Sequence, residues 1–456
     1  MGASSVPNDL PMATRSVRPS GEEIMSTSKL TIVRLSLMEM LEFVVFGSWF
    51  ATLGLVLATN HLPAIIGTAY ALGAVAAIIS PLFLGALSDR FFASEKVLGL
   101  AHICGGVLMF FTPSVVKTGN GMLVLAILFA YMLFFMPTLG IANSIAFRNI
   151  GTEQRLFPYI RVFGTFGWVV AGVLVGAMRL SASVSVFTVA GFSSLLFGAY
   201  SFTLPYTPPQ AKGAKFSFGD IVGAKAYVLF RQRNFTVLII CALLTSVSLG
   251  VYNTYASPYL GVLGVSNVAG VMALGQASEV VCIVLIPIAL RTIGMKFSLL
   301  GGMAMWGVRF LLFMLAAKGH TGYAVGAVAI QGICNDFFLV LAAMYIDRVA
   351  PDDLKAQAQS ILILVISGFG SFIGSIMSGS IYASTVALYP SGGASVWHQL
   401  WLTPIGVAIL TAIIWILLFR YPRLQTLTST ELAGPGMTSE FTPPVRKKSS
   451  DEQWER

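Results

Sequence analysis

Twelve apolar stretches, each long enough to cross a bilayer as a helix, occupy most of this chain. A transmembrane helix needs about 20 predominantly apolar residues. The stretches fall approximately at 31–58, 62–88, 97–116, 121–147, 156–178, 183–205, 235–261, 265–290, 296–317, 322–347, 356–385 and 396–420. Hydrophobic residues make up 56% of the 456 residues and charged residues only 10%, which excludes a soluble enzyme. The sequence therefore predicts an all-α membrane protein with twelve transmembrane helices.

The basic residues indicate how these helices are oriented. The net charge of +9 arises from 28 Lys and Arg residues, but these are scattered through short connections, so nucleic acid is not an expected partner. Connections after the even-numbered stretches are rich in them, as at Arg90 and Lys96, whereas the opposite side offers only Lys117, Arg179 and Lys318. Because cytoplasmic loops carry the excess of Lys and Arg, we expect both termini to be cytoplasmic.

The longest internal connection, residues 206–234, divides the chain into two halves of six stretches each. We expect a six-helix bundle over 30–205 and a second, pseudo-symmetric one over 235–420, with a substrate site near the midplane between them. Residues 1–29 lack the apolar core and cleavage site of a signal peptide, and are expected to form a cytoplasmic tail. Residues 421–456, rich in Thr, Ser, Pro and Gly, are predicted to be a disordered cytoplasmic tail.

Three ionisable residues, Arg161, Glu279 and Asp336, lie inside apolar stretches. Each such group costs roughly 2.5–3.5 kcal/mol at the centre of a membrane helix, and therefore usually lines a cavity on a substrate or proton path. The four cysteines and four histidines are dispersed, and there is no P-loop or HExxH motif. The sequence thus predicts a transporter, and neither an enzyme nor a protein with a metal or cofactor.

The fifth stretch aligns three polar or aromatic side chains on one helical face. Arg161, Thr165 and Trp168 stand at positions i, i+4 and i+7, which share a face of an α-helix. A cation, a hydroxyl and an indole in this arrangement are suited to a polar ring compound, through stacking and hydrogen bonds. Alternatively, Arg161 only anchors the cytoplasmic end of its helix.

Polar side chains also gather in the eighth and tenth stretches. Gln276 and Glu279 share a face in the eighth, and Gln331, Asn335 and Asp336 lie together in the tenth. A carboxylate that alternates between a dry and a charged environment can bind and release a proton. We therefore take Glu279 and Asp336 as candidates for proton coupling.

A structural role for these carboxylates stays open. Glu279 and Asp336 are alternatively held in buried ion pairs with Arg161 or Arg309.

The first stretch adds two more carboxylates. Glu39 and Glu42 are one helical turn apart and continue along one face to Phe46 and Trp49. A role in a cavity and a shallow position in contact with cytoplasmic water are both open for this pair.

One short motif follows the second stretch. Gly85-Ala-Leu-Ser-Asp89-Arg90 resembles the cytoplasmic signature of the major facilitator superfamily, in which a glycine permits close helix approach and Asp-Arg pairs tie neighbouring helices. The resemblance implies a gating role for Gly85, Asp89 and Arg90. The alternative is an ordinary charged loop.

Further motifs run through nearly the whole chain. They are Phe46-Gly-Ser-Trp49 with Thr52-Leu-Gly54, Met136-Pro-Thr-Leu-Gly140 with Asn143, Arg161-x-x-Gly-Thr165-x-Gly167, Gln276-x-Ser-Glu279, Arg309-Phe310 and Asp336-Phe-Phe338. Taken together, they resemble the bacterial nucleoside:proton symporters within the major facilitator superfamily. The resemblance implies twelve helices in two pseudo-symmetric bundles, monomers in the cell inner membrane, and uptake of nucleosides with protons by alternating access.

The resemblance also implies the ligand contacts. The positions that carry over are Arg161, Thr165, Asn253, Gln276, Glu279 and Asp336, with Trp168 at an aromatic position.

The chain departs from the family pattern beside these positions. Gly250 stands where the pattern has Gln, Gln331 and Asn335 stand where it has Tyr and Phe, and Glu42 replaces a Gln. The two amides make one wall of the site more polar. A proton-coupled symporter of a sugar, a polyol or another small polar metabolite on the same scaffold is therefore the alternative reading, and a sensor that binds a ligand without moving it is a third.

Overall fold

The computed structural model describes residues 28–420 apart from 81–82, 85–86, 89–90 and 210–222, and its regular elements there are all helical. Two groups of helices follow each other along the chain. The N-terminal group consists of α1 (Lys29–Gly47), α2 (Leu53–Thr59), α3 (Ile66–Ser80), α5 (Ser94–Lys117), α6 (Gly121–Ile150), α7 (Phe157–Ala177) and α8 (Ser185–Ser201). The C-terminal group consists of α10 (Arg233–Val262), α11 (Val268–Thr292), α12 (Gly294–Ala316), α13 (Thr321–Ala329), α14 (Gln331–Asn335), α15 (Leu341–Val349), α16 (Lys355–Ile363), α17 (Ser371–Ser384) and α18 (His398–Leu418).

The helices confirm a multi-pass, all-helical membrane protein. Among the described residues, nine helices are long and apolar enough to cross a membrane, and the pair Thr321–Ala329 and Gln331–Val349, bent by 44°, makes a tenth. The other two predicted stretches are helical as well, but α8 has only 17 residues and α1 carries Arg34, Glu39 and Glu42 within its 19 residues.

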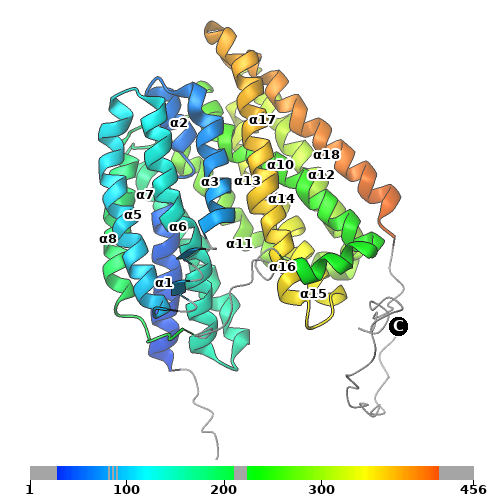
Figure 1. The fold of residues 1–456 in the computed structure, drawn as a ribbon. Coiled ribbons are helices and arrows are strands. Elements are labelled where there is room, and N and C mark those ends of the chain that lie inside the picture. The colour runs from blue at the N-terminus through cyan, green and yellow to red at the C-terminus, as the bar shows by residue number, and fades with distance from the viewer. Residues whose placement is uncertain (1–27, 81–82, 85–86, 89–90, 210–222, 421–456) are drawn as a thin grey trace, which may run out of the picture.

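The two groups lie side by side and touch along several helix pairs (Figure 1). Within the N-terminal group, α1 packs on α7 and α5 packs on α6 and α8; within the C-terminal group, α10 packs on α17 and α18. Between the groups, α7 packs on α11, α3 on α17 and α2 on α10.

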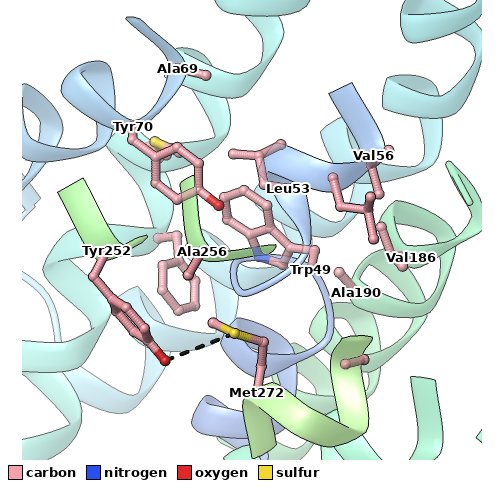
Figure 2. Packing of buried hydrophobic residues seen from close by; sticks show 14 of the residues in the cluster. Trp49, Leu53, Val56, Ala69, Tyr70, Val186, Ala190, Tyr252, Ala256 and Met272 are labelled. Carbon is pink, nitrogen blue, oxygen red and sulfur yellow. Dashed lines mark hydrogen bonds between the residues drawn. The ribbon is translucent and has the colours of Figure 1, made fainter. Parts of the chain in front are cut away.

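Apolar side chains from both groups form one continuous core. Figure 2 shows Trp49, Tyr70 and Val186 from the N-terminal group near Tyr252 and Met272 from the C-terminal group, with the Tyr252 hydroxyl 3.9 Å from the Met272 sulfur. A second buried cluster lies wholly within the C-terminal group.

Two segments of π-helix interrupt the C-terminal helices. One covers Asp336–Val340 and the other Leu364–Gly370. A β-carbon at Gly302 of α12 would lie 2.6 Å from the carbonyl of Phe337, so this glycine lets α12 approach the wider turn. Such π-bulges are common at functional sites, and this one begins at a candidate proton-coupling residue.

Glycines bring the two groups into backbone contact. A β-carbon at Gly54 in α2 would lie 2.7 Å from the carbonyl oxygen of Thr254 in α10, and one at Gly67 in α3 would lie 2.8 Å from the α-carbon of Gly379 in α17. Any other residue at these positions would have to push one group away from the other.

We expect Gly67→Ala to lower the melting temperature of the purified protein in detergent. The added methyl group meets backbone atoms of α17, which cannot move aside as a flexible side chain does, and overpacking of this kind costs about 1–3 kcal/mol. Gly301→Ala in α12 is the matched control, because a β-carbon there meets nothing within 4 Å. Equal melting temperatures for the two variants would contradict the close contact between α3 and α17.

Candidate functional site

A cavity of about 510 Å³ lies between the two groups of helices and is lined by residues of both. Pockets of this size accommodate small organic ligands. On the N-terminal side its lining is mainly apolar and includes the aromatic rings of Phe46, Phe50, Tyr70 and Trp168, and on the C-terminal side it carries amides and hydroxyls. The aromatic and polar lining residues are Phe46, Phe50, Tyr70, Asn143, Trp168, Tyr252, Asn253, Gln276, Gln331, Asn335, Ser367, Ser371 and Ser375.

The aromatic wall is built from α1, the turn that follows it, α3 and α7. The Phe46 ring lies 4.9 Å from that of Trp168 in an edge-to-face contact and 4.5 Å from that of Phe50, and Phe50 lies 5.1 Å from Tyr70. The Tyr70 hydroxyl donates a hydrogen bond of 2.8 Å to the carbonyl of Phe50. The rings are thus held by one another, and they offer a rigid surface to a planar ligand.

The polar wall centres on Glu279. Its Oε1 accepts hydrogen bonds from Asn335 Nδ2 at 2.8 Å and from the amide nitrogens of Gln276 and Gln331 at 3.3 Å each. The three amide residues line the cavity and Glu279 lies behind them. An ionised carboxylate only accepts hydrogen bonds, so the contact with Glu279 fixes the amino group of each amide toward it.

The local fold explains how residues of two helices reach Glu279. Gln276 lies one turn before Glu279 on α11, whereas Gln331 and Asn335 lie one turn apart on the short helix α14, which follows the 44° bend. Gly332 brings α14 against α11, and its backbone N–H donates to Ser278 Oγ at 2.9 Å.

Asp336 is buried next to this wall, with 5% of its surface exposed. Its Oδ2 has no hydrogen-bond partner among the described residues, and it does not line the cavity. Burying an unpaired carboxylate is costly, and the cost is removed when the group binds a proton. The alternative of an ion pair is not supported, because within the described part of the chain no basic nitrogen lies within 4.0 Å of Glu279 or Asp336.

Arg161 has a different partner. Its Nε lies 3.9 Å from Glu39 Oε2, its guanidinium lies 4.3 Å from the centre of the Phe43 ring, and 38% of its side chain is exposed. Thr165 is half-buried on the same face of α7. Of the three aligned residues on α7, only Trp168 lines the cavity.

The structure therefore divides the sequence-based candidates. Trp168, Asn253, Gln276, Gln331 and Asn335 line the cavity, and Glu279 supports three of them. Arg161, Thr165 and Asp336 lie outside its lining. The candidate gating residues Gly85, Asp89 and Arg90 all lie outside the described residues, in 85–86 and 89–90.

Neither alternative for Glu39 and Glu42 holds. Both side chains are buried, with 1% and 0% exposure, so they do not reach cytoplasmic water through the surface, and neither lines the cavity. Glu42 contacts His102 instead, a pairing between distant stretches that sequence spacing could not reveal.

The sequence offered Arg309 only as a motif residue and as an alternative ion-pair partner, and the structure gives it other contacts. Arg309 of α12 is fully buried, with its guanidinium 4.2 Å from the centre of the Tyr252 ring and 4.6 Å from that of Trp306. Its Nε donates to the carbonyl of Ala327 at 3.0 Å. Tyr252 lines the cavity, so this cation lies directly behind the cavity wall. A basic residue inside an apolar stretch was the feature of the sequence that could have indicated this buried cation.

The fold is that of the major facilitator superfamily of secondary transporters. The crystal structure of the nucleoside transporter NupG matches with a TM-score of 0.75 at 24% identity, covering 86% of this chain and 100% of that one. A bacterial homologue of the lysosomal transporter Spinster matches with a TM-score of 0.64 at 14% identity, over 87% of this chain and 98% of that one.

The family follows from sequence comparison. The model of the nucleoside H⁺ symporter family matches residues 29–424, and the chain belongs to that family. YegT of Escherichia coli K12, named as a candidate nucleoside transporter, is 34% identical over 86% of this chain and 94% of its own length. The xanthosine permease of the same organism is 29% identical over 85% of this chain and 96% of its own length.

We expect Asn335→Leu to destabilise the protein at neutral pH. The change removes the shortest hydrogen bond to the Glu279 carboxyl group, and a typical hydrogen bond contributes about 0.5–1.5 kcal/mol. Asn143→Leu is the matched control, because Asn143 also lines the cavity but makes no contact with Glu279. The melting temperatures of both variants in detergent test this prediction. An equal decrease for the two variants would show that the hydrogen bond between Asn335 and Glu279 does not stabilise the protein.

Proposed function

We propose that the protein takes up a nucleoside together with a proton, by alternating access around the central cavity. The observation that carries this proposal is the polar wall, in which Glu279 organises three cavity-lining amides opposite a wall of aromatic rings. A nucleoside combines a planar base with a hydroxyl-rich sugar. The chain's membership of the nucleoside H⁺ symporter family supports the same cargo.

In this proposal the two walls recognise different parts of the ligand. The base stacks against Trp168 and Phe46, while Asn253, Gln276 and the amides of α14 bind its polar edge and the sugar hydroxyls. Arg161 and Thr165 extend the same face of α7 and contact the ligand as it leaves the cavity. The named cargo of one relative, xanthosine, is a purine nucleoside of this chemical kind.

Asp336 and Glu279 couple the ligand to the proton. Asp336 lies beside Asn335 and has an unpaired oxygen, so a proton bound there removes a buried charge, and its loss alters the surroundings of the amide wall. A membrane potential supplies about 2.3 kcal/mol per charge per 100 mV, which supports roughly fortyfold accumulation.

The two bundles, the linker, the gating residues and the tails each have a role in this proposed mechanism. Bundles over 30–205 and 235–420 move against each other, joined by the linker 206–234, and Gly85, Asp89 and Arg90 gate the cytoplasmic side. The tails 1–29 and 421–456 face the cytoplasm, and the protein works as a monomer in the inner membrane. The excess of basic residues in connections on that side supports the orientation.

A second cargo is favoured by one specific observation. The amides of Gln331 and Asn335 make the C-terminal wall rich in hydrogen-bonding groups, which also suits a sugar or a polyol. Uptake of labelled nucleosides and sugars into cells, with and without a protonophore, separates the two cargoes. We expect a nucleoside to accumulate and the protonophore to abolish its accumulation; accumulation that resists the protonophore would overturn proton coupling.

We expect Asp336→Asn to abolish uphill accumulation in proteoliposomes under a pH gradient. The amide cannot exchange a proton, so the gradient no longer drives the cargo. Counterflow of labelled nucleoside, which needs alternating access but no net proton movement, should persist.

The matched control for this variant is Asp347→Asn. Asp347 lies on α15 of the same group, with 65% of its side chain exposed, and its replacement should leave uphill uptake intact. Uphill uptake by Asp336→Asn at the level of the control would remove Asp336 from the coupling mechanism.

A further inference from the structure

One face of α12 contacts three successive parts of the bent span 321–349. Gly302, Trp306 and Arg309 stand at positions i, i+4 and i+7 of this helix, and residues with this spacing share a helical face. The bent span beside them consists of α13, α14, the π-helix Asp336–Val340 and α15, with the 44° bend between α13 and α14. We call these three residues of α12 the α12 face.

Two residues of the α12 face donate hydrogen bonds to the bent span, one on each side of the bend. Arg309 Nε donates a bond of 3.0 Å to the carbonyl of Ala327 in α13. Trp306 Nε1 donates a bond of 3.1 Å to the carbonyl of Cys334 in α14. Because the two donors belong to one rigid helix, the bonds fix the two sides of the bend relative to each other.

Gly302 continues the α12 face to the π-helix. A β-carbon at this position would lie 2.6 Å from the carbonyl carbon and oxygen of Phe337. The backbone of α12 therefore packs directly on the backbone of the π-helix, which a larger residue would prevent.

A bend inside a membrane span needs contacts of this kind. Breaks in a helix are tolerated within the bilayer where neighbouring helices supply hydrogen bonds to the backbone groups at the break. Arg309 and Trp306 are 0% and 2% exposed, so water does not compete for their bonds. Removal of either donor would take a hydrogen bond from a buried carbonyl.

The segment that the α12 face contacts carries the polar wall of the cavity. Cys334, whose carbonyl accepts from Trp306, is followed by Asn335, and Gln331 lies one turn before Asn335. Both amides donate to Glu279. The position of α14 therefore decides how these amides meet the carboxyl group.

The α12 face also lies behind a second part of the cavity lining. The Arg309 guanidinium is 4.2 Å from the centre of the Tyr252 ring, and Tyr252 lines the cavity. Among the described residues, α12 contributes nothing to the lining itself. The α12 face thus acts on the cavity only through other residues.

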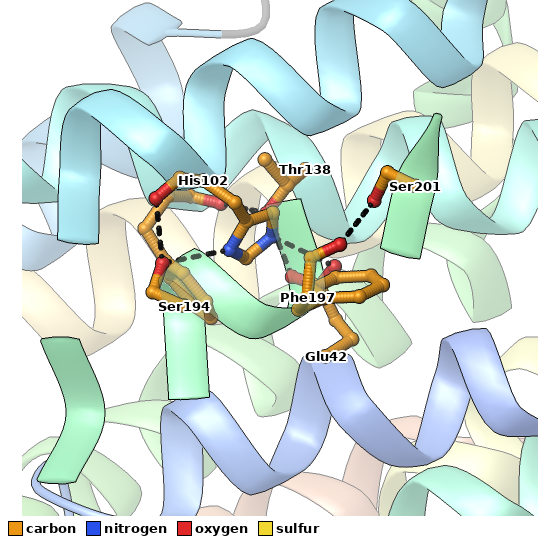
Figure 3. Close-up of polar contacts among 7 residues, drawn as sticks. Glu42, His102, Thr138, Ser194, Phe197 and Ser201 are labelled. Carbon is orange, nitrogen blue, oxygen red and sulfur yellow. Dashed lines mark hydrogen bonds and ion pairs between the residues drawn. The ribbon is translucent and has the colours of Figure 1, made fainter. Parts of the chain in front are cut away.

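A second buried polar network lacks such a link. Figure 3 shows Glu42 of α1 in contact with His102 of α5 and Thr138 of α6. All three residues belong to the N-terminal group and none lines the cavity. Of the two networks, the α12 face is therefore the one that bears on the candidate site.

We propose that Gly302, Trp306 and Arg309 are positioning residues for the cargo. They fix the bend between α13 and α14, and with it the orientation of Gln331 and Asn335 toward Glu279 and the cavity. The residues of the α12 face do not touch the cargo, so their replacement weakens binding by displacing the amides. The identity of the cargo rests on the proposed function, whereas the contacts of the α12 face do not.

The first test removes one of the two hydrogen bonds. Trp306→Phe keeps an aromatic ring but has no N–H for the carbonyl of Cys334. Trp415→Phe is the matched control, because Trp415 is also fully buried, donates from Nε1 to the carbonyl of Lys296 at 2.9 Å, and does not line the cavity.

The readout is counterflow of labelled uridine or xanthosine in proteoliposomes. We expect Trp306→Phe to raise the KM by about two- to tenfold, the range that corresponds to the loss of one hydrogen bond. Trp415→Phe should keep the wild-type KM, although both variants lower the melting temperature. An equal KM for the two variants would overturn the proposal. So would a Trp306→Phe protein that alone fails to fold, because the α12 face would then stabilise the whole fold and not the cavity wall.

The second test uses neighbouring glycines of α12. In Gly302→Ala the added methyl group meets the carbonyl of Phe337, whereas in Gly301→Ala it meets nothing within 4 Å. We expect Gly302→Ala to raise the KM and Gly301→Ala to leave it unchanged. The same KM for both variants would contradict a role for the contact between α12 and the π-helix.

Arg309→Lys tests the third residue without removing its charge. Lysine has a methylene group where arginine has Nε, so the bond to the carbonyl of Ala327 is lost while a cation remains. We expect a higher KM with a melting temperature close to that of the wild-type protein. An unchanged KM would remove Arg309 from the set of positioning residues.

A further readout is independent of the cargo. Hydrogen exchange in detergent, followed by mass spectrometry, reports on the peptide that contains Gln331–Asn335. We expect faster exchange there in Trp306→Phe and Gly302→Ala than in the wild-type protein and the two controls. Wild-type exchange in both variants would overturn the proposal, whatever their KM. If the wild-type protein moves no nucleoside, the proposed function is wrong, and hydrogen exchange still decides whether the α12 face fixes the bend.

Discussion

The bilayer offers no hydrogen bonds, and this constraint accounts for the arrangement of the polar side chains around Glu279 and Glu42. Groups that lipid cannot solvate must find partners in the protein or border a cavity. Glu279 is satisfied by three amides, and Glu42 by Thr138 and His102. The cavity, the bent pair of helices α13 and α14, and the buried pair of Glu42 and His102 therefore all accommodate polar side chains within the membrane-spanning helices. Each lies where the sequence has a polar residue within an apolar stretch.

The fold was largely predictable because the same constraint permits so few solutions. Apolar stretches of membrane length favour helices, and the regular elements of the described residues are all helical (Figure 1). The bend at Ile330 and the π-helix that begins at Asp336 were not predictable from periodicity. Gly332 of α14 packs against α11 beside the bend, and Gly302 of α12 packs against the π-helix at Phe337, and both contacts join residues far apart in the sequence.

The candidate site was predictable in part. Helical spacing predicts contacts between residues of one helix, but it does not predict contacts between helices that are far apart in the sequence. Helical spacing placed Gln276 beside Glu279, and the structure confirms their contact. Spacing could not show that Arg161 turns to Glu39 instead of to the cavity, since that contact depends on how α7 packs against α1. For the same reason His102 looked isolated in the sequence, although it is paired with Glu42 across 60 residues of chain.

Both groups of helices contain buried polar atoms without a hydrogen-bond partner among the described residues. In the N-terminal group, Glu42 and His102 have partners at every ring nitrogen and carboxylate oxygen, whereas Glu39 Oε1 and Asn143 Oδ1 have none among the described residues. Beside the polar wall of the C-terminal group, Arg309 Nη1 and Nη2, Gln331 Oε1, Asn335 Oδ1 and Asp336 Oδ2 have none among the described residues. Unpaired buried groups carry a free-energy cost that new partners remove. A proton or a ligand that reaches this wall therefore lowers the free-energy cost of the unpaired groups gathered there, which lie on α12, on α14 and at the start of the π-helix Asp336–Val340.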